Sequence, residues 1–214
     1  MILSRGRSYL FIHIPKTGGT SMALALEARA MKDDIMLGDT PKARRRRRRL
    51  AGVQAAGRLW KHATIADLDG LVAAEELPRL FCFTMVRNPW DRVVSYYHWL
   101  RAQRFDHPSV RLARAAPFER FLEDAGTQAS LARWPAGRYM RAADGTERVD
   151  AWIRLEHLSR DLAPLEAHLG FALALPHANR SDREAGYRAA YTPALRDIVA
   201  RCCREDIERF GYDF

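Results

Sequence analysis

The sequence is poor in lysine and cysteine, and it has no apolar stretch long enough to cross a bilayer. Its three cysteines include the adjacent pair Cys202 and Cys203, and they form neither a metal-ligand spacing nor an even-numbered disulfide framework. This scarcity favours a reducing compartment. Arg5 and Arg7 precede a short apolar run, as in a signal peptide, but the run leads into a glycine turn instead of a cleavage site. We therefore expect a soluble, cytoplasmic protein without a membrane span.

Positive charge is in excess and is carried almost entirely by arginine. Lysine and arginine number 35 against 26 acidic residues, a formal net charge of +9, and only four of the 35 are lysines. Such a surplus favours anionic ligands, whether a nucleotide, an acidic polysaccharide or nucleic acid, without choosing among them. The length of 214 residues and the hydrophobic content of 48% predict a single folded domain over residues 1–214.

The feature around which the chain is organised lies near its beginning. The apolar run Tyr9–Ile14 predicts a buried strand, and Gly18 and Gly19 predict a turn directly after it. An Ala/Leu-rich helix is expected over Ala23–Ala30. Backbone N–H groups at the start of such a helix, together with its dipole, favour an anion.

The side chains of this turn strengthen that interpretation. Lys16 adds a full positive charge, and Thr20 and Ser21 add hydroxyl donors. An ordinary strand–turn–helix is the simpler alternative, and a P-loop nucleotidase is the closer competitor. The P-loop pattern places its lysine after the second glycine, whereas Lys16 precedes Gly18 and Gly19. The turn is therefore predicted to hold a phosphate or sulfate group outside the Walker pattern.

Strands alternating with helices predict an α/β fold, in which a parallel sheet is flanked by helices. A helix through Leu68 and Leu77 is expected, with an N-cap at Thr64, an acid at the capping-box position in Asp67, and its end at Pro78. The other elements expected are a strand over Leu80–Val86, a helix from Pro89 through Leu100, a short helix over Pro117–Asp124, a strand over Val149–Leu155, a helix over Leu158–Leu169, and a long helix from Pro193 to about Phe210. Ligands of such sheets bind at the carboxyl ends of the strands.

A second anion site is expected where the second of these strands ends. Arg87 follows that strand, and Ser95 lies eight residues further on, in the next helix. If the two strands are neighbours, Arg87 and the Lys16 turn face the same crevice, which suits a ligand with phosphate at two places. The structural alternative for Arg87 is an ion pair with Asp91.

These two segments carry a resemblance to a known family. The stretches Phe11–Ser21 (FIHIPKTGGTS) and Val86–Tyr96 (VRNPWDRVVSY) resemble the donor-binding motifs of the carbohydrate sulfotransferases, especially the branch with the heparan 2-O- and chondroitin/dermatan-type enzymes and their bacterial relatives. Weaker similarity extends over Val149–Leu158, Asn179–Ser181, Tyr191–Leu195 and Asp206–Phe214. The resemblance therefore covers nearly the whole chain and implies a P-loop-like sulfotransferase fold.

The resemblance implies a donor, 3′-phosphoadenylyl sulfate (PAPS), with 3′,5′-bisphosphoadenosine (PAP) as product. It assigns the 5′-phosphosulfate to the segment Lys16, Thr17, Gly18, Gly19, Thr20 and Ser21, and the 3′-phosphate to Arg87 and Ser95. A loop with Arg180, Ser181 and Arg183 is a weaker candidate for contact with the nucleotide. The acceptor implied is a hydroxyl of a carbohydrate or a related small molecule, and an acidic one would suit the positive charge.

Sulfuryl transfer requires charge stabilisation and a base. Lys16 would neutralise the leaving oxygen during an in-line transfer, and the absence of clustered carboxylates predicts that no metal is needed. The expected base is His62, as at the matching place in similar enzymes, with His98 and Glu156 as alternatives. His13, on the first strand, is expected to be structural.

The six consecutive arginines Arg44–Arg49 are expected to form a solvated loop or helix edge, because like charges repel one another. The run has no interleaved aromatic residues for base stacking, so no specific nucleic-acid partner is predicted. Two rival functions stay open: a nucleotide-dependent kinase with a P-loop-like fold, and a non-catalytic module that binds polyanions or nucleic acid through this run. The identity of the acceptor and the oligomeric state are not encoded in a readable form.

Overall fold

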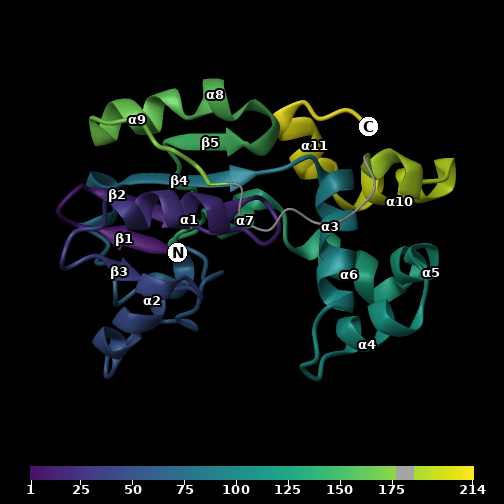
Figure 1. The fold of residues 1–214 in the computed structure, drawn as a ribbon, viewed down its shortest axis with the longest axis horizontal. Helices are drawn as coiled ribbons and strands as arrows, with labels where there is room; N and C mark the ends of the chain where they lie inside the picture. The colour runs from purple at the N-terminus through teal and green to yellow at the C-terminus, as the bar shows by residue number, and fades with distance from the viewer. Residues whose placement is uncertain (177–185) are drawn as a thin grey trace. The chain divides into compact units, whose positions relative to one another are not determined.

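The computed structural model describes residues 1–176 and 186–214 and divides into two compact units. The first unit contains Met1–Val86 and residues 136–176, and the second contains Arg87–Pro135 and residues 186–214. Figure 1 shows the elements of both units. The expectation of one domain stays a prediction, and each unit is described by itself.

The first unit is built on a five-stranded sheet with the order β3-β1-β2-β4-β5. Strands β2 (Tyr9–Ile12), β4 (Phe81–Val86) and β5 (Ala151–Arg154) are parallel neighbours, with Ile12 opposite Thr84 and Thr84 opposite Trp152. This arrangement confirms the predicted α/β fold. Strands β1 (Ile2–Ser4) and β3 (Ile35–Met36) extend the sheet by antiparallel pairing, and the sequence did not predict them. Two or three residues are too few to show a strand pattern.

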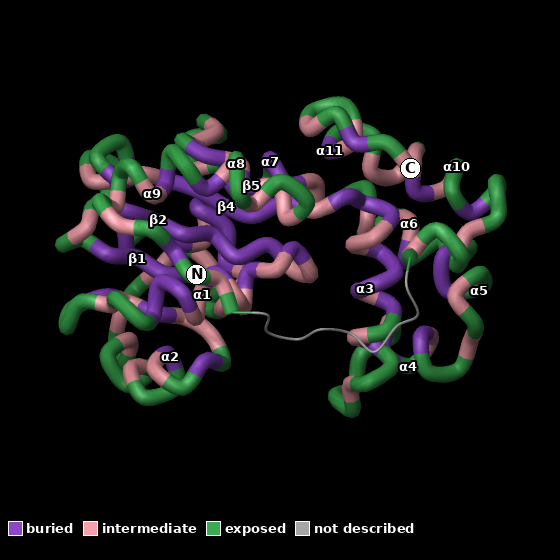
Figure 2. The backbone as a smooth tube through the Cα atoms, turned by 45° about the horizontal axis from the view of Figure 1, so that its top comes forward, coloured by how far each residue is buried: buried purple, intermediate pink, exposed green. Residues whose placement is uncertain are grey.

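The central strands are buried because helices cover the sheet (Figure 2). All four residues of β2 are buried, and Phe11 and Phe83 stack with ring centroids 5.2 Å apart. The one hydroxyl within β4, that of Thr84, is fully buried and donates a 2.7 Å hydrogen bond to the Ile12 carbonyl. The near-continuous apolar runs of β2 and β4 are thus explained by burial in a parallel sheet.

Helix α1 (Gly19–Ala28) packs Met22 and Leu26 into the same core cluster as the strands. The predicted helix over Leu158–Leu169 is interrupted, forming α8 (Leu158–Asp161) and α9 (Ala163–Leu169). Pro164 at the start of α9 explains the interruption, since proline lacks the N–H that a continuous helix requires. The helix ends at Gly170 with φ 75°, as its glycine predicted.

The predicted helix through Leu68 and Leu77 is wrong. The expected cap forms, because the Thr64 N–H and hydroxyl donate to Asp67 while the Asp67 N–H donates to the Thr64 hydroxyl. Only the short 3-10 helix η2 (Ala66–Leu68) follows, and η3 (Leu77–Arg79) lies further on. Gly70 adopts φ 91°, and the Asp69 carbonyl accepts a bond from the Ala56 N–H, so both divert the backbone from a helix.

The arginine run forms the end of α2 (Pro41–Arg46) and the 3-10 helix η1 (Arg47–Leu50). Most of its side chains are exposed, which agrees with the expected solvated helix edge. Arg46 donates to the Asp34 carbonyl at 3.1 Å, and Arg49 donates to the Lys32 carbonyl. The first unit is completed by α7 (Ala136–Tyr139) and by η4 (Leu155–His157), which follows β5 directly.

The second unit is helical. Helix α3 (Pro89–Arg101) begins as predicted, with the Asn88 side chain accepting from the Trp90 N–H. The long helix expected from Pro193 is divided at Cys203. The remaining helices of this unit are α4 (Pro108–Ala115), α5 (Phe118–Glu123), α6 (Ala125–Arg133), η5 (Tyr187–Ala190), α10 (Pro193–Cys202) and α11 (Arg204–Phe210).

Bonds from the C-terminal segment fix the beginning of α3 within the second unit. The Asn88 amide donates to the Asp213 carbonyl at 2.7 Å, and the Trp90 indole N–H donates to the Arg196 carbonyl at 3.0 Å. The Tyr191 hydroxyl donates to the Trp90 carbonyl at 2.8 Å. These bonds connect distant parts of the sequence to the residues that follow Arg87.

Across the described ranges 1–176 and 186–214, no helix combines the length and the apolar character needed to span a membrane. The cytoplasmic location stays a prediction.

Candidate active site

The turn after β2 has an unusual backbone. Lys16 adopts φ 68°, a left-handed conformation that costs a residue with a side chain about 1 kcal/mol, and Gly18 follows with φ 88°. The Gly18 carbonyl then accepts from the N–H groups of Ser21 and Met22 at 3.0 and 3.4 Å, which starts α1. Strained non-glycine residues cluster at functional sites, so the conformation of Lys16 marks this turn.

Contacts require both glycines of the turn, and the positive φ of Gly18 requires that glycine a second time. A Cβ added to Gly18 would lie 2.9 Å from Leu155 Cδ1, and one added to Gly19 would overlap the imidazole ring of His13. From the sequence, these glycines indicate only a turn. The structure adds that the His13 ring lies against the first residue of α1.

Thr17 differs from the other residues of the turn. Its side chain is buried, and its hydroxyl donates a 2.9 Å hydrogen bond to the Ile14 carbonyl. This bond closes the turn and gives the hydroxyl a structural role. Only the backbone of Thr17 is then suited to an anion, whereas Thr20 and Ser21 are half-buried residues in the first turn of α1.

His62 lies beside this turn, in the same unit. Its Nδ1 donates to the His13 carbonyl, with the two atoms 2.7 Å apart, and the two imidazole rings are edge to face at a centroid distance of 4.7 Å. Because a carbonyl oxygen can only accept, Nδ1 carries the proton and Nε2 carries the lone pair of the neutral ring. Burial lowers the pKa of His62 to about 3, so the ring is neutral at physiological pH.

His13 is buried, and its ring stands between the turn and His62. Burial, followed by the neighbouring His62, lowers the pKa of His13 well below its ordinary value. Both imidazoles are therefore neutral, and His13 contacts His62 with its ring and its carbonyl while it contacts Gly19 with its ring. The sequence predicts a structural role for His13 but does not indicate this connection, because residues 13 and 62 are far apart in the chain.

Charged and aromatic side chains surround His62. Lys61 forms a 2.6 Å ion pair with Asp39, and this pair, followed by Arg44 and Arg47, lowers the pKa of the Asp39 carboxyl. The arginine run therefore lies electrostatically close to the segment that carries His62. Trp60 contacts His62 edge to face, with the ring centroids 5.0 Å apart. No local pattern in the sequence indicates a role for Trp60.

Arg87 and Ser95 belong to the second unit. The Arg87 guanidinium pairs with Asp91, one turn along α3, with 2.7 Å between Nε and Oδ2 and 2.5 Å between Nη2 and the same oxygen. The ion pair considered as the alternative for Arg87 is thus present. Ser95 is buried on α3, one turn beyond Asp91. The expectation that Arg87 and the Lys16 turn face one crevice stays a prediction.

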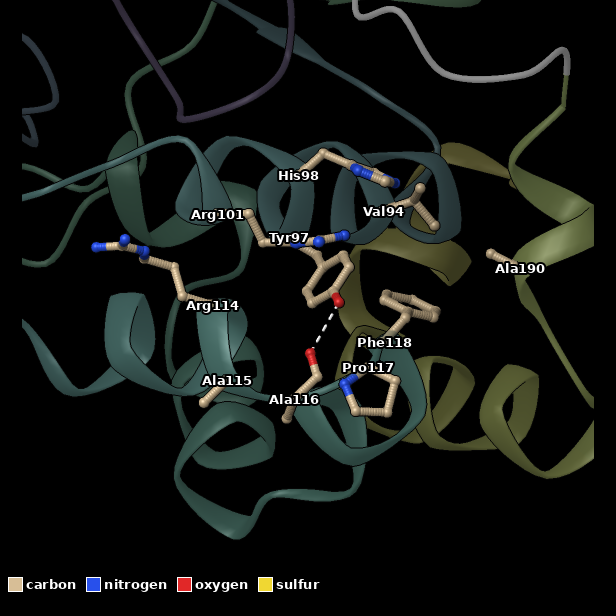
Figure 3. A pocket seen from close by; sticks show the side chains of 10 residues that line it. All are labelled: Val94, Tyr97, His98, Arg101, Arg114, Ala115, Ala116, Pro117, Phe118 and Ala190. Carbon is tan, nitrogen blue, oxygen red and sulfur yellow. Dashed lines mark hydrogen bonds between the residues drawn. The ribbon is translucent and has the colours of Figure 1, made fainter.

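The two alternative bases, His98 and Glu156, are both exposed. His98 is exposed on α3 and lines a groove of about 490 Å³ within the second unit, shown in Figure 3. The groove also contains the ring of Tyr97, whose hydroxyl donates to the Ala116 carbonyl at 2.8 Å. Glu156 is exposed in η4, after β5. Glu156 directly follows Leu155, the residue that packs against Gly18 in the first unit.

Residues 1–176 and 186–214 contain no group of three or more His, Cys, Asp or Glu side chains that could hold a metal ion. Arg180, Ser181 and Arg183, the weaker candidates for nucleotide contact, lie outside the described residues.

Residues 1–213 match the sequence model described as the Sulfotransferase family. The chain belongs to the sulfotransferase family. The match covers elements of both units, which confirms the resemblance inferred from the two motifs and the prediction that the protein is a sulfotransferase. No curated protein matches this sulfotransferase in sequence.

The fold of this sulfotransferase is similar to that of a solved relative. A crystal structure of mouse sulfotransferase SULT7A1, complexed with PAP, aligns with a TM-score of 0.55 and 18% sequence identity. The alignment covers 97% of this chain and 86% of the mouse chain. This likeness confirms the expected sulfotransferase fold.

Proposed function

We propose that this sulfotransferase moves a sulfuryl group from PAPS to a hydroxyl of a carbohydrate acceptor, with His62 as base and Lys16 opposite the leaving group. The observation that carries the proposal is the series of contacts from His62 through His13 to Gly19. It places a neutral imidazole beside a glycine turn that has the chemistry of an anion site. The PAP bound to the mouse relative supports the choice of donor.

The residues of the turn fit a phosphosulfate group. Lys16 provides a full charge, and Thr20 and Ser21 provide hydroxyls at the start of α1, where the backbone N–H groups and the helix dipole favour negative charge. When bound, the donor supplies an activated sulfuryl group. Arg87, just before α3, and Ser95, within α3, are proposed to hold its 3′-phosphate. Arg87 would then share its guanidinium between Asp91 and that phosphate.

The hydrogen bond of His62 to the His13 carbonyl supports its proposed role as base. Since Nδ1–H donates to the His13 carbonyl, Nε2 is the atom that accepts the proton of the acceptor hydroxyl. The oxygen–sulfur bond forms as the bond between sulfur and the phosphate oxygen breaks, and the electron pair of that bond stays on the phosphate. Lys16 opposes this developing charge. A base with a pKa of about 3 accepts its proton only as the new bond forms and the hydroxyl becomes acidic.

In this proposal, neither sulfuryl transfer nor binding of PAPS requires a metal ion, because Lys16 neutralises the charge that a divalent cation neutralises in many phosphoryl transfers. A transfer assay run in EDTA and in Mg²⁺ tests this point by comparing the two turnover rates. Undiminished turnover is the expected result, and dependence on Mg²⁺ and ATP would favour a kinase instead.

The decisive experiment is transfer of labelled sulfate from PAPS to a panel of oligosaccharides and simple alcohols. The expected result is labelled product from at least one carbohydrate, with release of PAP. The rival polyanion-binding function is separated by replacing the exposed residues Arg44, Arg45, Arg47 and Arg48 with serine. Loss of heparin binding with retained sulfate transfer agrees with our proposal, whereas a wild-type chain that binds heparin and transfers nothing supports the rival.

A further inference from the structure

Trp60 is an exposed tryptophan in contact with the proposed base. In residues 1–176 and 186–214, the large hydrophobic side chains that remain exposed are Met31 at 37%, Trp60 at 41% and Phe105 at 51%. Trp60 differs from the other two because its indole contacts His62 edge to face at 5.0 Å between centroids. The exposed part of this indole is open to a ligand bound beside the proposed base, and burying it on binding would be favourable.

Arg58 extends the same surface. Its guanidinium carbon lies 5.1 Å from the centroid of the Trp60 ring, a distance typical of a cation–π contact. The residue is exposed, and within the described part of the chain its guanidinium forms no ion pair. Lys61, which lies between Trp60 and His62 in sequence, is instead paired with Asp39. Arg58 is therefore the cation of this surface that a ligand can recruit without breaking an ion pair.

We propose that Trp60 and Arg58 form the acceptor platform: the indole packs against the C–H face of a pyranose ring, and Arg58 binds an anionic substituent of that sugar. This inference rests on the proposed function and names the chemical class of its acceptor. The faces of an aromatic ring are electron-rich, and the axial C–H groups of a pyranose present a weakly positive apolar surface to them. The hydroxyl groups project from the edge of the sugar, which leaves one of them for Nε2 of His62.

The platform assigns different parts of specificity to its two residues. Trp60 accepts any sugar with an apolar face and so determines that the acceptor is a carbohydrate. Arg58 distinguishes a carboxylated or sulfated sugar from a neutral one, because a guanidinium offers forked donors to an anion. The positive charge of Arg44 and Arg47, which acts on nearby Asp39, favours the same anionic class.

The test compares Trp60→Ala, Trp60→Phe and Arg58→Gln with wild type, and uses Phe105→Ala as a matched control. Phe105 is another exposed aromatic residue, and it belongs to the second unit. The probes are an oligosaccharide of alternating glucuronic acid and N-acetylglucosamine, neutral maltohexaose, and 4-nitrophenol. Transfer kinetics give kcat and KM for each, and calorimetry gives the affinity for PAP and for each sugar in the presence of PAP.

Trp60→Ala should raise KM and Kd for the favoured sugar by about tenfold or more, a loss of roughly 1.4 kcal/mol, with kcat changed far less and PAP affinity unchanged. Trp60→Phe should restore part of that affinity, and Phe105→Ala should match wild type. Arg58→Gln should weaken only the uronic-acid oligosaccharide, leaving maltohexaose unaffected.

If Trp60→Ala binds the sugar as tightly as wild type, the acceptor platform is wrong, even if sulfate transfer is confirmed. If the protein transfers sulfate only to 4-nitrophenol, a carbohydrate is not the ligand of the platform. If wild type transfers sulfate to none of the probes, the proposed function fails, while the calorimetric comparison still decides whether Trp60 binds a sugar.

Discussion

The main-chain carbonyl of His13 accepts a 2.7 Å hydrogen bond from Nδ1 of His62, although the two residues are 49 positions apart in the sequence. This bond selects the tautomer of His62 and directs the lone pair of the ring to Nε2. Because the His13 ring also lies against Gly19, one residue connects the orientation of the proposed base with the start of α1. The predictions below separate the contributions of these residues.

Replacing His62 with glutamine should reduce kcat by about 10²–10⁴-fold, since a positioned base contributes a factor of that size. The affinity for PAP, measured by calorimetry, should stay at the wild-type value. His98→Gln and Glu156→Gln are the controls, and both should turn over normally. If His98→Gln or Glu156→Gln loses turnover and His62→Gln does not, the base has been assigned to the wrong residue.

Lys16→Gly should separate stability from activity. Glycine adopts φ 68° without strain, so the free energy of unfolding should be unchanged or higher by up to about 1 kcal/mol. Thermal denaturation measures this change. Turnover should fall by about 10²–10³-fold, because the charge opposite the leaving oxygen is lost. Lys32→Gly, at an exposed lysine, is the control for removing one positive charge. Normal turnover in Lys16→Gly would remove Lys16 from the mechanism.

Arg87→Ala should weaken PAP binding by about ten- to a hundredfold, as expected for losing charge-assisted hydrogen bonds worth roughly 1.5–3 kcal/mol. The matched variant is Asp91→Asn, which removes the carboxylate from the 2.5 Å ion pair but keeps the guanidinium. It should bind PAP at least as tightly as wild type. Calorimetry on both variants decides between a phosphate-binding and a purely structural Arg87: unchanged affinity in Arg87→Ala indicates the structural role.

Gly19→Ala should destabilise the fold by about 1–3 kcal/mol, because the added methyl group overlaps the His13 ring and forces it to move. Displacing His13 also disturbs the carbonyl that orients His62, so turnover should fall in the folded fraction. Gly38→Ala is the control, since a Cβ there would meet only the Ala43 Cβ, at an ordinary contact distance of 3.8 Å. Chemical denaturation measures both variants, and equal stability would show that the His13 ring yields without cost.

Acidification should destabilise the protein through its buried histidines. The pKa of His62 is about 3 in the folded chain and ordinary, near 6.5, in the unfolded one, so the unfolded state binds more protons between these values. The stability contributed by the neutral His62 is therefore fully present above pH 6.5 and does not increase further at higher pH. It is lost progressively as the pH falls from 6.5 toward 3. His13, with its lowered pKa, acts in the same direction, and each histidine contributes at most roughly 1.4 kcal/mol per pH unit.

Denaturant titrations from pH 7 to pH 5 check this dependence. His62→Gln should have a shallower loss of stability over this range than wild type, because it removes a buried imidazole whose pKa is lowered by folding. Equal slopes for wild type and His62→Gln would show that His62 does not lose its proton on folding.

The sequence alone determined the elements whose signal is local. Near-continuous apolar runs predicted β2 and β4, because strands buried on both faces must be apolar. Pro89 after Asn88 predicted the start of α3, because both residues have fixed parts in helix initiation. The two motifs likewise predicted the family, since the turn chemistry of Lys16–Ser21 lies within six consecutive residues.

Only the tertiary structure decided what depends on distant contacts. Thr64 and Asp67 formed the predicted cap, yet the helix failed because the segment near Gly70 pairs with residues more than ten positions earlier. The sequence could nominate His62 but could not show that the His13 carbonyl fixes its tautomer, that burial lowers its pKa, or that Trp60 lies against it. These properties arise from packing between segments far apart in the chain, and no local pattern encodes such contacts.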